Sequence, residues 1–150
     1  MIRRLYHAHS IVLDGWLLFC VMDKTVLLVD DDKTFKLLLE KAFKEQFYNT
    51  VTVGNTTEAL DKLHEFAPDI MLLDLGLPGE SGMEFLRKLR SGNEYPDLLV
   101  IMLTNNTSFE EIANGYELGI RRYIIKSETT TEQIIQAVTE TLTAEENSKK

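Results

Sequence analysis

The sequence is short of cysteine, of positive charge and of long apolar runs. Its single cysteine, Cys20, excludes an internal disulfide framework and fits a reducing compartment, so we expect a cytoplasmic protein. Only 16 Lys and Arg residues stand against 24 Asp and Glu, and the resulting net charge of −8 would repel the phosphates of nucleic acid. The apolar stretch at residues 16–22 falls well below the roughly 20 residues that a membrane-spanning helix needs. We therefore expect neither nucleic acid nor a membrane as a direct partner.

The chain does contain enough apolar residues for one folded domain. Hydrophobic residues make up 44% of its 150 residues, which excludes a disordered chain. A domain of this length buries roughly 68–70% of the surface that its unfolded chain exposes, so the core needs no metal or disulfide. We expect one domain over residues 24–145 and a polar tail at 146–150, with no room for a separate DNA-binding or catalytic module.

Residues 1–23 read differently from the remainder of the chain. Two arginines precede an apolar stretch, as in a signal peptide, but an Asp-Gly pair beginning at Asp14 interrupts that region and no small-residue cleavage site follows. We interpret the segment as an upstream extension that is dispensable for the fold, with the natural start at Met22 or nearby. The alternative is a short helix or strand that buries Trp16 and Phe19 on this domain or on a second copy.

From residue 24 onward, apolar runs of strand length alternate with helical patterns. Three of the five runs are almost continuously hydrophobic, which is typical of strands that are covered on both faces in a parallel sheet. The predicted strands are Thr25–Asp30, Thr50–Gly54, Asp69–Asp74, Leu98–Leu103 and Arg122–Ile125. The alternation predicts five βα units and an α/β fold.

The stretches between and after these strands have the apolar spacing of amphipathic helices. Ser108 and Glu111 form a capping box that opens the fourth helix. The apolar stripes are Phe35, Leu38, Leu39, Ala42 and Phe43; Ala59, Leu60 and Leu63; Phe85, Leu86 and Leu89; Phe109, Ile112, Ala113 and Tyr116; and Ile134, Ile135, Val138 and Leu142. Leu37 faces away from the first stripe, as a surface leucine or as a docking contact for a partner helix.

Carboxylates follow two of the predicted strands at the point where each strand ends. Asp30, Asp31 and Asp32 follow the first strand, and Asp74 ends the third. One aspartate could cap a helix, but a cap does not explain three in a row with a fourth on another strand. Clustered carboxylates repel one another unless a cation joins them, and an all-oxygen site suits Mg²⁺. The residues themselves therefore predict a magnesium site at this edge of the sheet.

Two further polar side chains end strands at the same edge. Thr104 follows the fourth predicted strand, and Lys126 follows the fifth. Separately, they could be a helix cap and a solvated lysine. Together, a hydroxyl donor and an ammonium group suit the oxygens of a phosphoryl group.

In order and spacing, four pieces of the sequence resemble the receiver domain of two-component response regulators. They are Val-Leu-Leu-Val-Asp30-Asp31-Asp32, Met-Leu-Leu-Asp74-Leu-Gly-Leu-Pro78 with Gly82 four residues on, Ile-Met-Leu-Thr104 and Tyr123-Ile-Ile-Lys126. The resemblance covers about residues 24–145. It implies a flavodoxin-like fold, with a five-stranded parallel sheet of order 2-1-3-4-5 and helices on both faces. In that order the ligand site lies between strands one and three, the two strands that end in Asp here.

The resemblance also implies roles for the matching acidic residues. Asp74 would accept a phosphoryl group from a histidine kinase or a histidine phosphotransfer protein. Asp31 would bind Mg²⁺ directly and Asp30 largely through water, with Asp74 as the third carboxylate at the metal. The backbone carbonyl of Gly76 would complete the protein ligands.

The remaining matches imply how the signal is formed and passed on. Thr104 and Lys126 would hold the phosphoryl oxygens, and Tyr123 would stand at an aromatic switch position, moving inward as the Thr104 hydroxyl follows the phosphoryl group. Such a receiver is a signalling protein that catalyses only its own aspartyl phosphorylation and dephosphorylation. It would change its binding to a downstream protein target, as a monomer or as a phosphorylation-dependent dimer.

Three positions depart from the family pattern. Leu77 stands before the proline where the family often has Met, which is a conservative change, and the other two lie beside the residues above. Ser127 stands where the family usually has a proline after the lysine. A cis bond before a residue other than proline costs about 3–4 kcal/mol, which disfavours the cis peptide that the family has there. Asn105 stands where the family usually has a small residue, and its side chain could restrict access to Asp74 or bond the phosphoryl group.

Two other functions fit parts of the pattern. A haloacid-dehalogenase-type phosphatase would use Asp30 as its nucleophile, since residues 30–34 (Asp-Asp-Asp-Lys-Thr) resemble its Asp-x-Asp-x-Thr motif. No Asp follows Lys126 to supply that family's last acidic motif, and Asp74 would lack a role. The third possibility is an interaction module that works without phosphorylation. The phosphorylated residue separates the three functions: Asp74, Asp30 or none.

Overall fold

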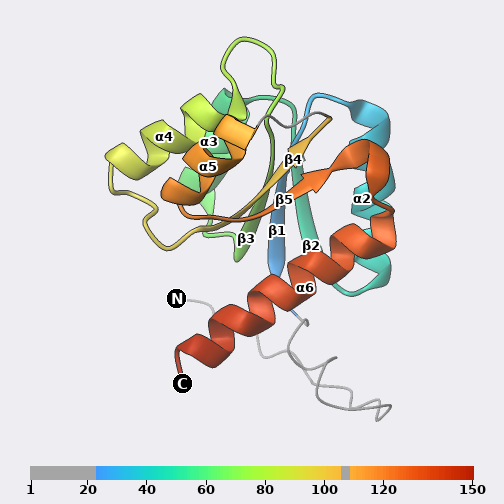
Figure 1. Ribbon diagram of the computed structural model, residues 1–150. Helices are drawn as coiled ribbons and strands as arrows, with labels where there is room; N and C mark the ends of the chain where they lie inside the picture. Colours follow the sequence, from blue (N-terminus) through green and yellow to red (C-terminus); the bar gives the residue numbers. More distant parts are fainter. Residues whose placement is uncertain (1–22, 106–108) are drawn as a thin grey trace.

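The computed structural model describes residues 23–105 and 109–150, and Figure 1 shows their arrangement. Two predictions lie outside the described residues: the N-terminal extension, apart from Asp23, and Ser108 of the predicted capping box. Within the described ranges, no helix combines the length and the apolar character that crossing a membrane requires.

A parallel sheet of five strands runs through the centre of the domain. Its order is β2-β1-β3-β4-β5, which confirms the order that the resemblance implied. The strands are β1 (Thr25–Val29), β2 (Asn49–Val53), β3 (Ile70–Asp74), β4 (Leu99–Thr104) and β5 (Ile120–Ile125). The largest difference from the predicted bounds is at β5, which begins two residues earlier than expected.

Helices cover both faces of the sheet (Figure 1). They are α2 (Lys33–Glu45), α3 (Thr56–Glu65), α4 (Gly82–Ser91), α5 (Phe109–Glu117) and α6 (Thr131–Ser148), with a short 3₁₀ helix η1 (Lys126–Glu128) before α6. Helices α2 and α6 pack on one face, and α3, α4 and α5 lie on the other. The residues of β1, β3 and β4 are almost completely buried between these layers, as their continuous apolar runs predicted. Full burial of each such side chain is worth about 1.5–3 kcal/mol.

The register of the sheet brings the carboxyl ends of its strands level. Asp74 pairs with the residue of β4 that precedes Thr104, and Thr104 pairs with the last residue of β5. Asp30 directly follows β1, and Lys126 directly follows β5. The four polar residues that the sequence placed at strand ends therefore meet at one edge.

The pairing of β4 with β5 is irregular near its start. Ile120 pairs with Val100, whereas Arg122 pairs with the next residue of β4, so Arg121 is the extra residue of a β-bulge. In a regular strand, residues at odd spacing face opposite sides of the sheet. Because of the bulge, Ile120 and Tyr123 both pack on the α3 side although they are three residues apart.

Two predictions about buried stripes were wrong. Leu38 was assigned to the core but is 54% exposed, because α2 contacts the sheet along a narrower stripe through Leu39. Tyr116, assigned to the stripe of the fourth helix, is 56% exposed. The polar tail is helical up to Ser148, and its Glu146 forms an ion pair with the body of the domain.

Candidate functional site

The three consecutive aspartates after β1 have different environments. Asp30 is fully buried, and its Oδ1 accepts a hydrogen bond from the backbone N–H of Asp32 at 2.9 Å. Asp31 is exposed. Asp32 caps α2, because its carboxylate accepts from the N–H groups of Thr34 and Phe35 at 2.9 and 3.0 Å. Helix capping therefore accounts for one of the three aspartates and leaves two for another role.

Asp74 ends β3 beside these carboxylates. Its Oδ1 accepts a hydrogen bond from the N–H of Gly76 at 3.2 Å, and 4% of the residue is exposed. Gly82, the first residue of α4, packs directly on the strand end: a Cβ at this position would overlap the Asp74 carbonyl oxygen. Glycine at position 82 therefore lets α4 approach and support the backbone that carries Asp74.

Lys126 extends across the same edge from β5. Its Nζ lies 2.5 Å from Oδ2 of Asp30 and 3.2 Å from Oδ2 of Asp74. The lysine side chain is 10% exposed. We call Lys126, Asp30 and Asp74 the carboxyl-edge cluster. In this cluster, the ammonium group of the residue that follows β5 lies beside carboxylates at the ends of two neighbouring strands. Little water reaches these groups.

Burial dominates the electrostatics of Asp30. Removal of the carboxylate from water raises the pKa of Asp30 above its ordinary value of 3.8, although the Lys126 ammonium and the Asp32 N–H favour the charged form. The neighbouring Asp74 carboxylate adds to the increase. One lysine against two buried carboxylates leaves an excess of negative charge, which a further cation would neutralise.

The carboxylates at this edge fit a divalent cation. Asp30, Asp31 and Asp74 each offer one carboxylate oxygen, and these oxygens all lie within 4.8 Å of one another. A small set of oxygen ligands with open space beside it suits Mg²⁺, which keeps several of its waters. The structure thus brings together the three carboxylates that the sequence predicted as metal ligands, and Gly76 lies beside them.

A hollow of about 920 Å³ opens over the site. Its walls are formed by Asp31, Asp32, Phe35, Asp74, Leu75, Gly76, Thr104, Asn105, Lys126 and Ser127. Two of the three departures from the family pattern, Asn105 and Ser127, therefore lie at the site. The described residues contain no cis peptide bond. Asp30 is fully buried and does not line the hollow, whereas Asp74 does line it. A nucleophile must be reached by its substrate, which favours Asp74 over Asp30.

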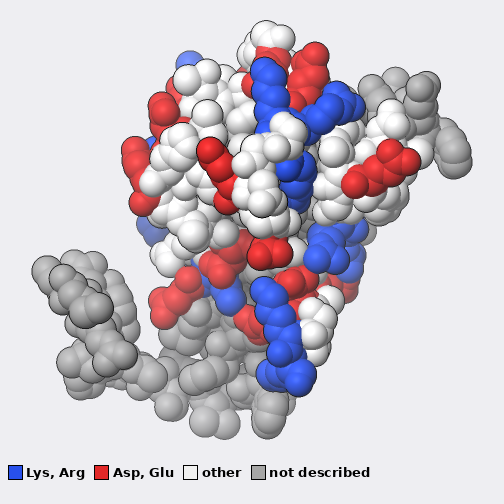
Figure 2. Space-filling model, turned by 90° about the vertical axis from the view of Figure 1, so that its left-hand side faces the viewer, with Lys and Arg blue, Asp and Glu red and all other residues white. Residues whose placement is uncertain are grey.

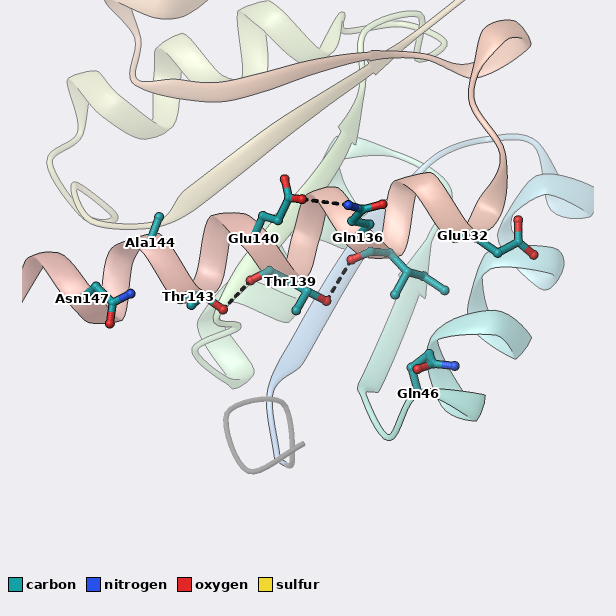
Figure 3. Close-up of a pocket in the computed structure, with 9 residues that line it drawn as sticks. Gln46, Glu132, Gln136, Thr139, Glu140, Thr143, Ala144 and Asn147 are labelled. Atoms are coloured by element: carbon teal, nitrogen blue, oxygen red, sulfur yellow. Dashed lines mark hydrogen bonds between the residues drawn. The ribbon is translucent and has the colours of Figure 1, made fainter. Parts of the chain in front are cut away.

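A second hollow, of about 720 Å³, lies along α6 and has a different chemistry (Figure 3). It is lined by Gln46, Glu132, Ile135, Gln136, Thr139, Glu140, Thr143, Ala144 and Asn147. Several of its polar groups already bond within the helix: Gln136 donates to Glu140 at 2.9 Å, and Thr139 donates to the carbonyl of Ile135 at 2.9 Å. Its walls contain no lysine or arginine from the part of the chain that the structure describes. The hollow at the strand ends is therefore the better candidate for chemistry.

The two predicted switch residues lie on the same side of the sheet. Thr104 is 3% exposed and alternates in phase with Met102 of β4, which packs on the α3 side together with Tyr123 of the neighbouring strand β5. The Tyr123 ring lies against α5 at Gly115, where a Cβ would overlap its hydroxyl group. It also meets the ring of Tyr116 edge-on, with centroids 5.8 Å apart. The structure confirms that the two strands are neighbours, and the switch itself stays a prediction.

Sequence reasoning missed a role for Phe35, which it assigned to the core alone. In the structure its ring lines the hollow, and Nζ of Lys126 lies over the ring, 4.8 Å from its centroid. The position of Phe35 in the sequence could have indicated this role, because Phe35 lies in the first turn of the helix that begins directly after the aspartates.

Comparison with known proteins identifies the family. The model of the response regulator receiver domain matches residues 26–139, so the chain belongs to this family. It is a receiver domain of two-component systems, a module for signalling by phosphorylation, as the resemblance predicted. The haloacid-dehalogenase alternative receives no support.

Relatives of known name agree with this assignment. The chain is 35% identical over 105 residues to the DNA-binding response regulator MtrA of Mycobacterium tuberculosis (strain ATCC 25618 / H37Rv), which covers 70% of the chain and 45% of MtrA. The match thus spans less than half of the length of that relative. The same values hold for MtrA of Mycobacterium bovis.

Solved structures share the fold. The chemotaxis protein CheY4 of Vibrio cholerae aligns with a TM-score of 0.73 and 25% identity, over 80% of this chain and 98% of that one. A CheY-like receiver domain protein from Methanospirillum hungatei JF-1 gives a TM-score of 0.76 and 25% identity, over 83% and 98%. The response regulator TrrA of Thermotoga maritima, in complex with Mg²⁺ and BeF, gives a TM-score of 0.67 and 26% identity, over 79% and 98%.

Proposed function

We propose that this chain is a cytoplasmic receiver that accepts a phosphoryl group on Asp74 from a histidine kinase or a histidine phosphotransfer protein and then changes its binding to a downstream protein. One observation carries the proposal. Asp74 is the carboxylate that both lines the hollow and contacts Nζ of Lys126, at 3.2 Å. It is therefore reachable and stands beside a fixed positive charge.

The residues of this site suit transfer to a carboxylate. An oxygen of Asp74 attacks phosphorus, the bond between phosphorus and the donor nitrogen breaks, and the donor leaves with that electron pair. Most of the catalysis in such a transfer is positioning and charge neutralisation. In this proposal the Lys126 ammonium neutralises one phosphoryl oxygen, and the Thr104 hydroxyl donates a hydrogen bond to another. The product is an aspartyl phosphate on β3.

Asp30, Asp31, Asp74 and the carbonyl of Gly76 would hold Mg²⁺. The ion, when bound, supplies positive charge beside the phosphoryl oxygens. The exposed Asp31 suits direct coordination, whereas the fully buried Asp30 suits contact through water. The complex of TrrA with Mg²⁺ and BeF, a protein to which this chain is similar, supports the choice of metal.

An exposed apolar pair beside the hollow suits a partner helix that carries the phosphorylated histidine. Leu37 and Leu38 on α2 are 69% and 54% exposed, and they follow Phe35 at the rim of the site. The prediction that Leu37 is a docking contact therefore extends to Leu38. On the face shown in Figure 2, by contrast, basic and acidic side chains are interspersed and form no continuous basic surface of the kind that nucleic acid binding needs.

A labelling experiment tests the acceptor. The wild type is incubated with Mg²⁺ and a small phosphodonor such as acetyl phosphate, and mass spectrometry locates the modified residue. We expect labelling of Asp74 in the wild type and none in Asp74→Asn. Asp69→Asn is the matched control, because Asp69 precedes the same strand at its opposite end.

The other outcomes distinguish the alternatives. Labelling that persists in Asp74→Asn but is lost in Asp30→Asn would contradict the proposal and support the phosphatase chemistry. No label in the wild type, with either a small donor or a histidine phosphotransfer protein, would favour an interaction module that works without phosphorylation.

A further inference from the structure

Phe35 is placed against the charged group on which the chemistry depends. Its backbone is fixed in the first turn of α2, since its N–H donates to the capping carboxylate of Asp32 at 3.0 Å. Its ring is half-buried and packs against the core formed with α2 and α6. Nζ of Lys126 lies over this ring at 4.8 Å from the centroid, within the range of a cation–π interaction.

Among the described residues, the Lys126 ammonium thus has three neighbours of two kinds. Two are the carboxylates of Asp30 and Asp74, at 2.5 and 3.2 Å, and the third is the aromatic face of Phe35. The lysine side chain is 10% exposed, so little water competes for the charge. A cation over an aromatic face is held more strongly when it is desolvated than at the surface.

We propose that Phe35 is a positioning residue that keeps the Lys126 ammonium at the site while the partners of its two carboxylates change. This inference rests on the proposed function. A phosphoryl group on Asp74 takes one carboxylate oxygen away, and a cation held by Asp30 and Asp74 competes with Lys126 for these two carboxylates. The ring of Phe35 is open to neither competitor. It is therefore the one of the three neighbours that can hold Lys126 equally in each state.

The alternative is that Phe35 only fills space at the rim of the core. The substitution Phe35→Leu distinguishes these roles, because it keeps an apolar side chain of similar length but removes the aromatic face. Phe35→Tyr keeps the aromatic face. Phe47→Leu is the matched control, because Phe47 lies two residues beyond the end of α2, is 62% exposed and does not line the hollow.

Two measurements test the proposal on the full chain. The first is the NMR chemical shift of the ε-CH₂ protons of Lys126 in the metal-free protein, which an aromatic ring facing them moves upfield. The second is the rate of labelling of Asp74 by acetyl phosphate with Mg²⁺. In Phe35→Leu we expect loss of the upfield shift and labelling slowed by about five- to tenfold. Phe35→Tyr should retain both properties, and so should Phe47→Leu.

Several results would overturn the inference. Labelling of Phe35→Leu at the wild-type rate would leave Phe35 as a space-filling residue. A loss confined to transfer from a protein donor would make it a docking contact instead. If the wild type itself is not labelled, the proposed function fails, and the metal-free shift of Lys126 then decides alone whether the ring positions the ammonium.

Discussion

Two clusters at opposite edges of the sheet contain the same groups, one lysine and two carboxylates, but differ in burial. At the amino edge, Lys24 pairs with Asp69 at 3.3 Å and with Glu146 at 2.9 Å, and the three side chains are between 25% and 35% exposed. In the carboxyl-edge cluster the side chains are between 0% and 10% exposed. Ion pairs near the surface contribute about 0–1 kcal/mol, whereas buried charges are costly to leave unpaired. Burial, and not the kind of residue, separates a structural contact from a reactive site.

The two clusters also show that one direction of pKa change can have opposite meanings. The hydrogen bond to Glu146 raises the pKa of Lys24 above 10.5, which favours its charged form. Burial raises the pKa of Asp30 above 3.8, which disfavours its charged form. The amino-edge pairs are therefore satisfied as they stand, while the carboxyl-edge cluster holds negative charge that a cation would stabilise.

The largest expected difference comes from removing each lysine. Lys126→Met leaves two buried carboxylates without their cation, and we expect it to lower the free energy of unfolding of the metal-free domain by about 3–5 kcal/mol. Lys24→Met removes a partly exposed pair and should cost about 1 kcal/mol or less. Urea denaturation of both variants in EDTA measures the difference. Equal losses of unfolding free energy in the two variants would contradict this prediction, because burial would then not determine how much each lysine contributes.

The next largest effect concerns the metal. Asp31→Ala removes the exposed carboxylate at the hollow, and we expect its affinity for Mg²⁺ to fall at least about tenfold, or ~1.4 kcal/mol. Asp32→Asn is the control, because asparagine also caps a helix well while the change removes one neighbouring charge. Titration of each variant with Mg²⁺ checks this. Equal affinity in Asp31→Ala and the wild type would contradict the assignment of Asp31 as the direct ligand.

A smaller, pH-dependent effect is expected for Asp30. Because the folded-state pKa of Asp30 is raised, its contribution to stability is fully present below the unfolded value of about 3.8 and is lost as the pH rises through the folded value. Without metal, Asp30→Asn should therefore be more stable than the wild type at pH 7, and the gain should shrink toward pH 4. The raised pKa of Lys24 has the opposite consequence at neutral pH. It adds to the stability of the folded state at pH 7, and this contribution is lost only as the pH rises above 10.5.

Urea denaturation in EDTA between pH 4 and pH 8 tests this prediction. Asp69→Asn, at the amino edge, serves as the control and should be no more stable than the wild type at any of these pH values. A stability gain of Asp30→Asn that does not change with pH would show that burial of the Asp30 charge is not its source.

The smallest effect is expected at the switch. Gly115→Ala places a methyl group where the Tyr123 hydroxyl lies and would also crowd Cδ1 of the buried Ile120, so the Tyr123 ring and the end of the Ile120 side chain should both move. NMR signals of the Tyr123 ring should shift in this variant, and they should also shift in the wild type when Mg²⁺ and a beryllofluoride mimic are added. The NMR signals of Lys24, at the amino edge, should stay unchanged in both comparisons. Gly92→Ala is the control, because a Cβ there would approach nothing closer than 3.5 Å. If the mimic binds and the Tyr123 signals stay unchanged, the conformational response to phosphorylation does not pass through Tyr123.

Local pattern was sufficient to locate the strands, the helices and the polar residues at strand ends. The strand order was implied by the resemblance to receiver domains, and that order is what puts Asp30 and Asp74 on neighbouring strands. Facts that depend on side-chain direction were not predictable. The exposure of Leu38 and the ring of Phe35 over Lys126 both depend on how α2 is rotated on the sheet. Apolar spacing alone leaves that rotation uncertain by about one residue, or 100°.

The bulge in β5 limits which changes of length this strand can accept. Arg121 is the extra residue that lets Ile120 and Tyr123 share one side of the sheet. Substitution of Arg121 alters a side chain whose recorded contact is an ion pair with Glu145 at 3.0 Å. Deletion of Arg121 would remove the bulge and leave Ile120 and Tyr123 two residues apart, which in a regular strand keeps both on the same side of the sheet. The pairing is regular from Tyr123 to the end of β5, directly before Lys126, so loss of one residue there would shift Lys126 away from the carboxyl-edge cluster. We therefore expect β5 to tolerate deletion of Arg121 but not deletion of a residue after Tyr123.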